Sequence, residues 1–220
     1  MATEKKVILI TGYPPHPGEA SNPSLDLAEA LDGREYKDYV FRHVAIPIRR
    51  SACVQTMEQA IDHLKPDIVI ATGLAPGRYS IAIERVGINV TDFPIPDEDG
   101  YISLNEPIDP DGPAAYFSTL PIRAMTKAVR KAGLPAYVSN TAGTFCCNML
   151  LYGTLNYISK KNLNIRMGMI HVPFAPNQIE NDYRATPSMS LENMIAGVEA
   201  AAKAAIDNEN DIEMICGYTN

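Results

Sequence analysis

The sequence lacks the features that mark membrane, secreted and metal-binding proteins. No window offers the ~20 consecutive apolar residues that a membrane-spanning helix needs. The stretch MATEKKVILIT has only a short apolar run and no small-residue cleavage site, so it does not resemble a secretory signal. None of the four cysteines stands in a C-x-x-C pair, and no H-E-x-x-H sequence occurs. We therefore expect no membrane or metal partner, reduced thiols and a cytoplasmic location.

Clusters of basic residues are also scarce. The chain has 19 Lys and Arg residues against 26 Asp and Glu, which gives a formal net charge of −7. A protein whose main partner is nucleic acid needs clustered cations to bind phosphates. The tight clusters here, Arg49-Arg50 and Lys160-Lys161, are typical of a solvated helix face. We expect no nucleic-acid partner.

The first third of the chain alternates between two kinds of apolar pattern. Residues 6–11 and 67–72 are continuous apolar runs that each end at a glycine, as in strands buried on both faces, and residues 38–46 resemble a third strand. Residues 23–32 and 51–65 carry apolar side chains at helical spacing. This order predicts an α/β fold, with a parallel sheet covered by helices on both faces.

The rest of the chain is less regular but extends the same pattern. Residues 74–120 are rich in Pro, Asp and Gly, and within them residues 80–90 alternate like a strand or a hairpin arm. Long irregular segments in compact domains tend to be functional. Nothing marks a second domain, so we predict one domain over residues 1–220. Further helices are expected at 121–132, at 145–160 and from 190, and further strands at 136–139 and 166–173.

Cys147 is the candidate nucleophile. A helix that begins near Phe145 would place Cys147 in its first turn, where free N–H groups and the helix dipole stabilise a thiolate. The same N–H groups could donate to an oxyanion. The alternative is that Cys146 and Cys147 are both small, buried, inert side chains.

A thiolate needs a base, and His171 is the best placed of the four histidines. It lies near the C-terminal end of a predicted buried strand, and open parallel sheets bind ligands at that edge. His43 and His63 are more typical of structural or solvent-facing positions. Glu84, inside the apolar segment 80–90, is a candidate to orient the histidine. The alternatives are a core role for His171, and for Glu84 a solvent-facing position or an ion pair with the adjacent Arg85.

Several blocks of sequence together resemble one enzyme family. They are TGYPPHPGEASNPS (11–24), IAIERVGIN (81–89), GPAAYFSTLPI (112–122) with SNTAGTFCCN (139–148), and MIHVPFAPNQ (169–178). On these blocks the chain resembles pyroglutamyl peptidase type I, also called pyrrolidone-carboxylate peptidase, over nearly its whole length.

The resemblance implies a fold, a reaction and a catalytic triad. The implied fold is a single-domain α/β/α sandwich with a twisted, mostly parallel but mixed sheet. The implied reaction is removal of an N-terminal pyroglutamyl residue from a peptide, without metal or cofactor, by an enzyme that is often a homotetramer. The implied triad is Cys147 as nucleophile, His171 as base and Glu84 as orienting group. The family's nucleophile directly precedes an asparagine, here Asn148, which distinguishes Cys147 from Cys146.

The resemblance also implies a substrate pocket, in which this chain departs from the family pattern. The implied pocket residues are Tyr13, His16, Asn22, Leu74, Phe145 and Cys146. His16 replaces a second aromatic residue, Leu74 replaces a glutamine, and Pro94 stands where many relatives carry arginine. Two alternatives therefore stay open: a related hydrolase acting on a different blocked amino terminus, and an α/β protein that binds a small molecule without peptidase activity.

Overall fold

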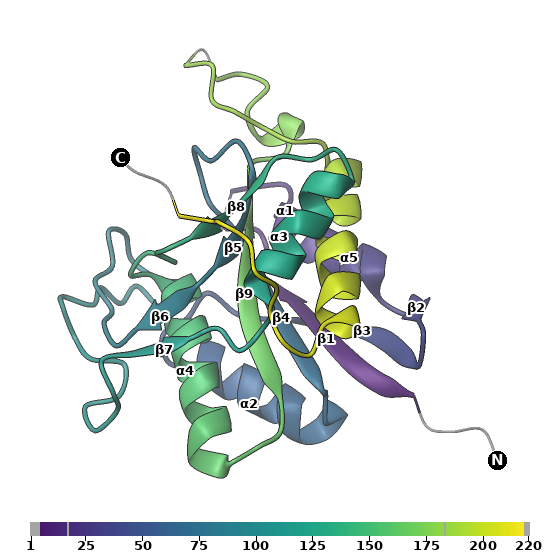
Figure 1. Ribbon diagram of the computed structural model, residues 1–220. Helices are drawn as coiled ribbons and strands as arrows, with labels where there is room; N and C mark the ends of the chain where they lie inside the picture. Colours follow the sequence, from purple (N-terminus) through teal and green to yellow (C-terminus); the bar gives the residue numbers. More distant parts are fainter. Residues whose placement is uncertain (1–4, 17, 183, 218–220) are drawn as a thin grey trace.

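A computed structural model, which describes residues 5–16, 18–182 and 184–217, contains a seven-stranded sheet (Figure 1). The strand order across the sheet is β2-β3-β1-β4-β9-β5-β8. In that order the strands are Glu35–Tyr36, Tyr39–Ala45, Lys6–Gly12, Ile68–Leu74, Arg166–Val172, Ile81–Glu84 and Ala136–Ser139. β6 (Val86–Ile88) and β7 (Ala115–Phe117) form a separate antiparallel pair.

The sheet is mixed because one of its connections is short. Strands β1, β3, β4 and β9 are mutually parallel, as the alternation of strands and helices predicts. The chain leaves β4 at residue 74 and enters β5 at residue 81. This connection is too short for a helical crossover, which would be needed to bring the chain back to the level where β4 began and let β5 run parallel to it. β5 therefore runs antiparallel to β9, and β8 runs parallel to β5.

Within the described part of the chain, five α-helices cover the two faces of the sheet (Figure 1). Helices α1 (Pro23–Leu31), α3 (Ile122–Lys131) and α5 (Leu191–Asp207) pack on one face, and α2 (Cys53–Leu64) and α4 (Cys146–Lys161) pack on the other. Side chains of the central strands β1, β4 and β9 alternate between the two resulting cores, as the pleat requires. The predicted α/β/α sandwich with a mixed sheet is confirmed.

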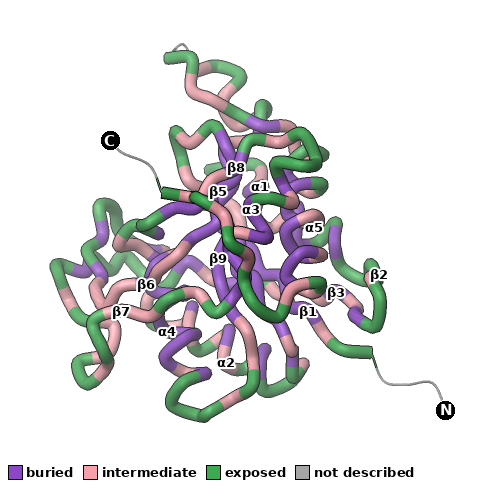
Figure 2. Tube along the Cα trace, in the orientation of Figure 1, coloured by how far each residue is buried: buried purple, intermediate pink, exposed green. Residues whose placement is uncertain are grey.

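Burial follows this layering. Figure 2 shows buried residues along the central strands and exposed ones along the outer loops. α4 is buried at 11 of its 16 positions, because the sheet, α2 and the β6–β7 pair surround it. Segment 80–90, expected as one strand or a hairpin arm, is instead divided into β5 and β6 on either side of Arg85. Among the described residues, no helix is long and apolar enough to span a membrane.

Candidate active site

The first turn of α4 presents Cys147 to a pocket. The helix begins at Cys146, and Phe145 precedes it in an extended conformation without a side-chain cap. The first N–H groups of a helix have no partner inside the helix, so they and the helix dipole favour negative charge at this end. Cys147, the second residue of the helix, is half-buried and lines the pocket. The predicted position of Cys147 in the first helical turn is therefore found.

Gly73 lets the thiol of Cys147 approach His171. Gly73 on β4 is the register partner of His171 on β9, and both face the side of the sheet that α4 covers. A Cβ atom at Gly73 would lie 2.8 Å from Cys147 Sγ and 3.3 Å from His171 Nε2. Because Gly73 has no side chain, the Cys147 sulfur and the His171 imidazole can come together above it.

Glu84 holds the other nitrogen of the imidazole. Ala82 on β5 lies directly opposite His171, and Glu84 lies two residues further along the same face of the strand. A diagonal neighbour of this kind is within reach of a long side chain. His171 Nδ1 and Glu84 Oε1 are 2.7 Å apart, and neither residue is more than 3% exposed. Cys147, His171 and Glu84 therefore form one contiguous row.

The environment of His171 favours its charged form. Burial alone lowers the pKa of an imidazole, because it removes water from the cation. The negative charges of Cys147 and Glu84, together with hydrogen bonds to both, outweigh burial and raise the pKa of His171 from 6.5 to about 9. An imidazolium beside the sulfur is the partner that a thiolate nucleophile needs.

A fourth charged residue, which the sequence did not single out, continues the row. Arg78 Nη1 donates to Glu84 Oε1 at 2.7 Å, and Arg78 Nη2 donates to the Thr141 carbonyl at 3.1 Å. The alternative pairing of Glu84 with Arg85 is wrong, because Arg85 Nε donates instead to Asn140 Oδ1 at 2.8 Å. A solvent-facing position for Glu84 is also wrong, because its exposed fraction is 0%.

The two adjacent cysteines have different surroundings. Cys146 is 1% exposed and belongs to the core between α2, α4 and the sheet. Burial raises the pKa of its thiol well above the usual range, and it does the same at Cys53. Both thiols are therefore neutral at physiological pH. Cys147, in contrast, is partly exposed and has the His171 imidazole nearby.

Cys147 opens onto a pocket of about 510 Å³, which we call the Cys147 pocket. All six residues expected to bind substrate line it: Tyr13, His16, Asn22, Leu74, Phe145 and Cys146. Sequence reasoning missed further lining residues, among them Glu19, Ile48, Arg78, Ile95, Ala142 and Phe174. Most of these residues are apolar and come from loops between strands and helices, so no periodic pattern marks them.

Two of the pocket residues also have structural contacts. Asn22 caps α1 by accepting from Ser24 N at 3.1 Å, and its amide donates to the Pro14 carbonyl at 3.2 Å. The Tyr13 hydroxyl donates to the Cys146 carbonyl at 3.1 Å, which ties the N-terminal loop to the start of α4. Asn22 and Tyr13 thus fix the wall of the pocket as well as line it.

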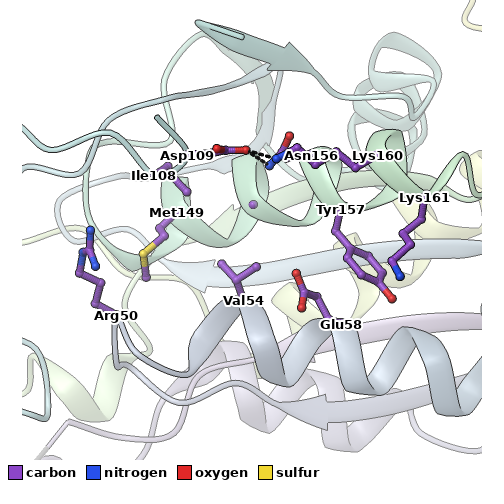
Figure 3. A pocket seen from close by; sticks show the side chains of 11 residues that line it. Arg50, Val54, Glu58, Ile108, Asp109, Met149, Asn156, Tyr157, Lys160 and Lys161 are labelled. Atoms are coloured by element: carbon purple, nitrogen blue, oxygen red, sulfur yellow. Dashed lines mark hydrogen bonds and ion pairs between the residues drawn. The ribbon is translucent and has the colours of Figure 1, made fainter. Parts of the chain in front are cut away.

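A second hollow of about 390 Å³ lies between α2 and α4, on the same face of the sheet (Figure 3). We call it the α2–α4 groove. It is lined by Arg50, Val54, Glu58, Ile108, Asp109, Met149, Gly153, Asn156, Tyr157, Lys160 and Lys161. Asn156 and Lys160 both bind Asp109 at its rim. Among the described residues, no cluster of His, Cys, Asp and Glu could hold a metal ion.

The comparisons with known proteins agree with this geometry. Residues 5–208 match the family model described as pyroglutamyl peptidase. The chain belongs to the pyroglutamyl peptidase family. It is 43% identical over 212 residues to the pyrrolidone-carboxylate peptidase of Vibrio campbellii, covering 96% of this chain and 98% of the relative. It is 41% identical over 209 residues to the Bacillus subtilis protein of the same name, and the match covers 95% of this chain and 96% of the relative.

Solved structures of family members share the whole fold. The chain matches the crystal structure of pyroglutamyl peptidase I from Bacillus amyloliquefaciens with a TM-score of 0.92 and 38% identity, covering 96% of this chain and 99% of the other. It matches the pyrrolidone carboxyl peptidase of Thermococcus litoralis with a TM-score of 0.92 and 36% identity, at the same coverage.

Proposed function

We propose that this chain is a cysteine exopeptidase that removes an N-terminal pyroglutamyl (5-oxoprolyl) residue from peptides. The observation that carries the proposal is the meeting of Cys147 Sγ and His171 Nε2 over Gly73, beside a pocket large enough for the substrate's end. The family match and the names of the relatives support the choice of substrate. In this proposal Cys147 is the nucleophile, His171 the general acid and base, and Glu84 the orienting group.

The reaction proceeds in two halves. The Cys147 thiolate attacks the carbonyl carbon of the pyroglutamyl residue, and the N–H groups at the start of α4 donate to the oxyanion that forms. Collapse breaks the peptide C–N bond, and the His171 imidazolium gives its proton to the leaving amine. His171 then takes a proton from water, whose oxygen attacks the thioester, and pyroglutamate leaves as the thiolate is restored.

The Cys147 pocket suits a blocked amino terminus. Pyroglutamate carries no amino-terminal charge, so an apolar pocket with a few hydrogen-bonding groups recognises it at little desolvation cost. In this proposal the ring of Phe145, fixed against Phe93 at a centroid distance of 4.6 Å, forms a wall for the lactam. Tyr13, His16, Asn22, Leu74 and Cys146 complete the binding surface.

A fluorogenic assay tests the proposal. The wild type should cleave pyroglutamyl-aminomethylcoumarin, whereas N-acetyl and free-amine analogues should be poor substrates. Cys147→Ala should abolish cleavage, since removal of a nucleophile leaves only binding and oxyanion contributions. Cys146→Ala is the matched control and should keep most of kcat, because its thiol is neutral and buried and takes no part in the chemical step; any change should fall on KM. Equal losses from the two variants would contradict the assigned roles.

The residues that depart from the family pattern support a second candidate substrate. His16, Leu74 and Pro94 all line the Cys147 pocket, and each replaces a side chain of different chemistry. The same row of residues could therefore act on another cyclic or acylated amino terminus. A panel of blocked peptides decides between the two: pyroglutamyl peptides should rank first, and a last place for them would favour the second candidate.

We further propose that the chain is one domain over residues 1–220, assembles as a homotetramer and works in the cytoplasm. Both hydrophobic cores pack against a single sheet, which supports one domain. The four cysteines are free thiols, which agrees with a reducing compartment. The tetramer rests on the family resemblance, and light scattering during size-exclusion chromatography would show it as a mass four times 24.0 kDa.

A further inference from the structure

Arg78 ends a row of four groups whose charges alternate. Taken contact by contact, the row runs from the Cys147 sulfur through the His171 imidazole and the buried Glu84 carboxylate to the Arg78 guanidinium at the pocket wall. The His171 nitrogen and the Arg78 nitrogen both lie 2.7 Å from the same oxygen, Glu84 Oε1. With all four groups ionised, the two positive and two negative charges cancel, and the row carries no net charge.

The negative charge of Glu84 is balanced by two cations, His171 and Arg78, and among the described residues no other group stabilises it. Its exposed fraction is 0%, and among the described residues its second oxygen, Oε2, has no hydrogen-bond partner. A carboxylate buried without a cation tends to take up a proton, because water no longer stabilises the charge. A neutral Glu84 would stop stabilising the His171 imidazolium, and the thiolate would lose its counter-ion.

Arg78 is itself held in place from outside the row. Its second terminal nitrogen donates to the Thr141 carbonyl, and its guanidinium lies 5.9 Å from the centroid of the Tyr137 ring. Its side chain is 22% exposed, so it reaches from the pocket wall to the buried carboxylate. The guanidinium is therefore fixed before any substrate binds.

We propose that Arg78 is a positioning residue that keeps Glu84 ionised and aligned, and thereby maintains the Cys147–His171 ion pair. This inference rests on the proposed cysteine chemistry but requires no particular substrate. It competes with a simpler role for Arg78, since a pocket-lining guanidinium could bind the substrate directly. The two roles differ in the free enzyme, because only the first affects Cys147 when no substrate is present.

Alkylation of Cys147 by iodoacetamide, followed by mass spectrometry across the pH range, tests the inference. Arg78→Met should move the pH of half-maximal alkylation upward by about one unit or more, as expected for loss of a partner charge within a few ångströms. Arg78→Lys, which keeps the charge, should move it much less. Arg85→Met is the matched control and should overlay the wild type, because Arg85 contacts Asn140 and not Glu84.

Two results would overturn the inference. An Arg78→Met profile that overlays the wild type would leave Arg78 without influence on the ion pair. A downward shift would mean that Glu84 stays ionised without Arg78 and that the guanidinium mainly repels the imidazolium. If Arg78→Met does not fold, Arg78→Gln, which can still donate a hydrogen bond, replaces it in the same comparison.

Steady-state kinetics adds a second readout. Arg78→Met should lower kcat about 10- to 100-fold with little change in KM, as for loss of an interaction that acts on the chemical step. A rise in KM alone would assign Arg78 to substrate binding instead. Because alkylation needs no substrate, its outcome stands even if pyroglutamyl peptides are not cleaved, so failure of the inference and failure of the proposed function are distinguishable.

Discussion

The two hollows beside α4 contain similar kinds of residues in different surroundings. At the wall of the Cys147 pocket, His171 pairs with Glu84 behind it, and their side chains are 4% and 0% exposed. In the α2–α4 groove, drawn in Figure 3, Lys160 pairs with Asp109. Their side chains are 57% and 16% exposed. Both pairs are within hydrogen-bonding distance. Both pairs join opposite charges, so the difference between the two pairs is how deeply they are buried.

The difference matters because water screens one pair and not the other. An exposed ion pair contributes little, since solvent competes for both partners. A buried charge must instead be balanced by its neighbours, and each neighbour then controls the protonation of the next. Contacts in the Cys147 pocket should therefore affect reactivity strongly, and contacts in the groove weakly.

The largest effect is expected at Glu84. Glu84→Gln keeps the shape but removes the charge that helps to raise the pKa of His171 to about 9. Wild-type activity on a pyroglutamyl peptide should fall as pH rises through about 9, when His171 loses the proton that the leaving amine needs. In Glu84→Gln, kcat/KM at neutral pH should drop by about 10³-fold or more. The alkaline limb should move down towards 6.5, the ordinary imidazole pKa.

A pH–rate profile of kcat/KM checks this prediction. His63→Gln is a suitable control, because His63 lies exposed on α2, away from the row. An alkaline limb that stays near 9 in Glu84→Gln would show that the carboxylate does not govern His171.

Gly73→Ala should have the next largest effect. The new methyl group would lie 2.8 Å from Cys147 Sγ and 3.1 Å from His171 Cδ2, so one of these side chains must move. A displacement of about 1 Å between reacting groups can cost about 10²-fold in rate. We expect a loss of that size in kcat, with the native circular dichroism spectrum retained. Normal activity in a folded Gly73→Ala protein would contradict the close approach of sulfur and imidazole.

Tyr13→Phe should have a smaller effect. It removes the hydrogen bond from the hydroxyl to the Cys146 carbonyl but keeps the aromatic ring. Loss of one neutral hydrogen bond costs about 0.5–1.5 kcal/mol of the free energy of unfolding. Urea denaturation should show that loss, and kcat/KM should fall less than in Gly73→Ala. An effect on activity as large as that of Glu84→Gln would place the hydroxyl in the chemistry itself.

Lys160→Met should have the smallest effect. It breaks the exposed pair with Asp109 in the α2–α4 groove. Many exposed ion pairs contribute nothing measurable, so kcat/KM should stay within about twofold of the wild type. A change of tenfold or more would mean that the groove is coupled to the Cys147 pocket, and the contrast between the two hollows would fail.

Local sequence patterns were enough to predict the strands and helices whose formation depends on neighbouring residues in the chain. The apolar runs at 6–11 and 67–72 are β1 and β4, and the helix start near Phe145 places Cys147 in the first turn of α4. The position of His171 at the carboxyl end of a parallel strand followed from the order of strands and helices.

Contacts that depend on how the strands pair in the mixed sheet could not be predicted from local sequence patterns. The direction of β5, which brings Glu84 diagonally beside His171, depends on pairing with a strand more than 80 residues away. Arg78 reaches Glu84 across the loop before β5, whereas sequence adjacency suggested Arg85. Gly73 matters because a side chain there would collide with Cys147 on α4 and His171 on β9. That collision depends on how two strands and a helix pack together, so local sequence does not predict it.

Labelling with 5-oxoprolyl chloromethyl ketone tests the central claim most directly. The reagent carries the pyroglutamyl ring, and its ketone takes the place of the scissile carbonyl. A thiolate held beside that carbonyl displaces chloride from the adjacent methylene carbon and forms a thioether. The account predicts rapid modification of Cys147 alone, located by tandem mass spectrometry of the peptide that contains both adjacent cysteines. Prolyl chloromethyl ketone, which lacks the lactam carbonyl, should react far more slowly. Modification of Cys146 or Cys53, or equal rates with the two reagents, would contradict the account.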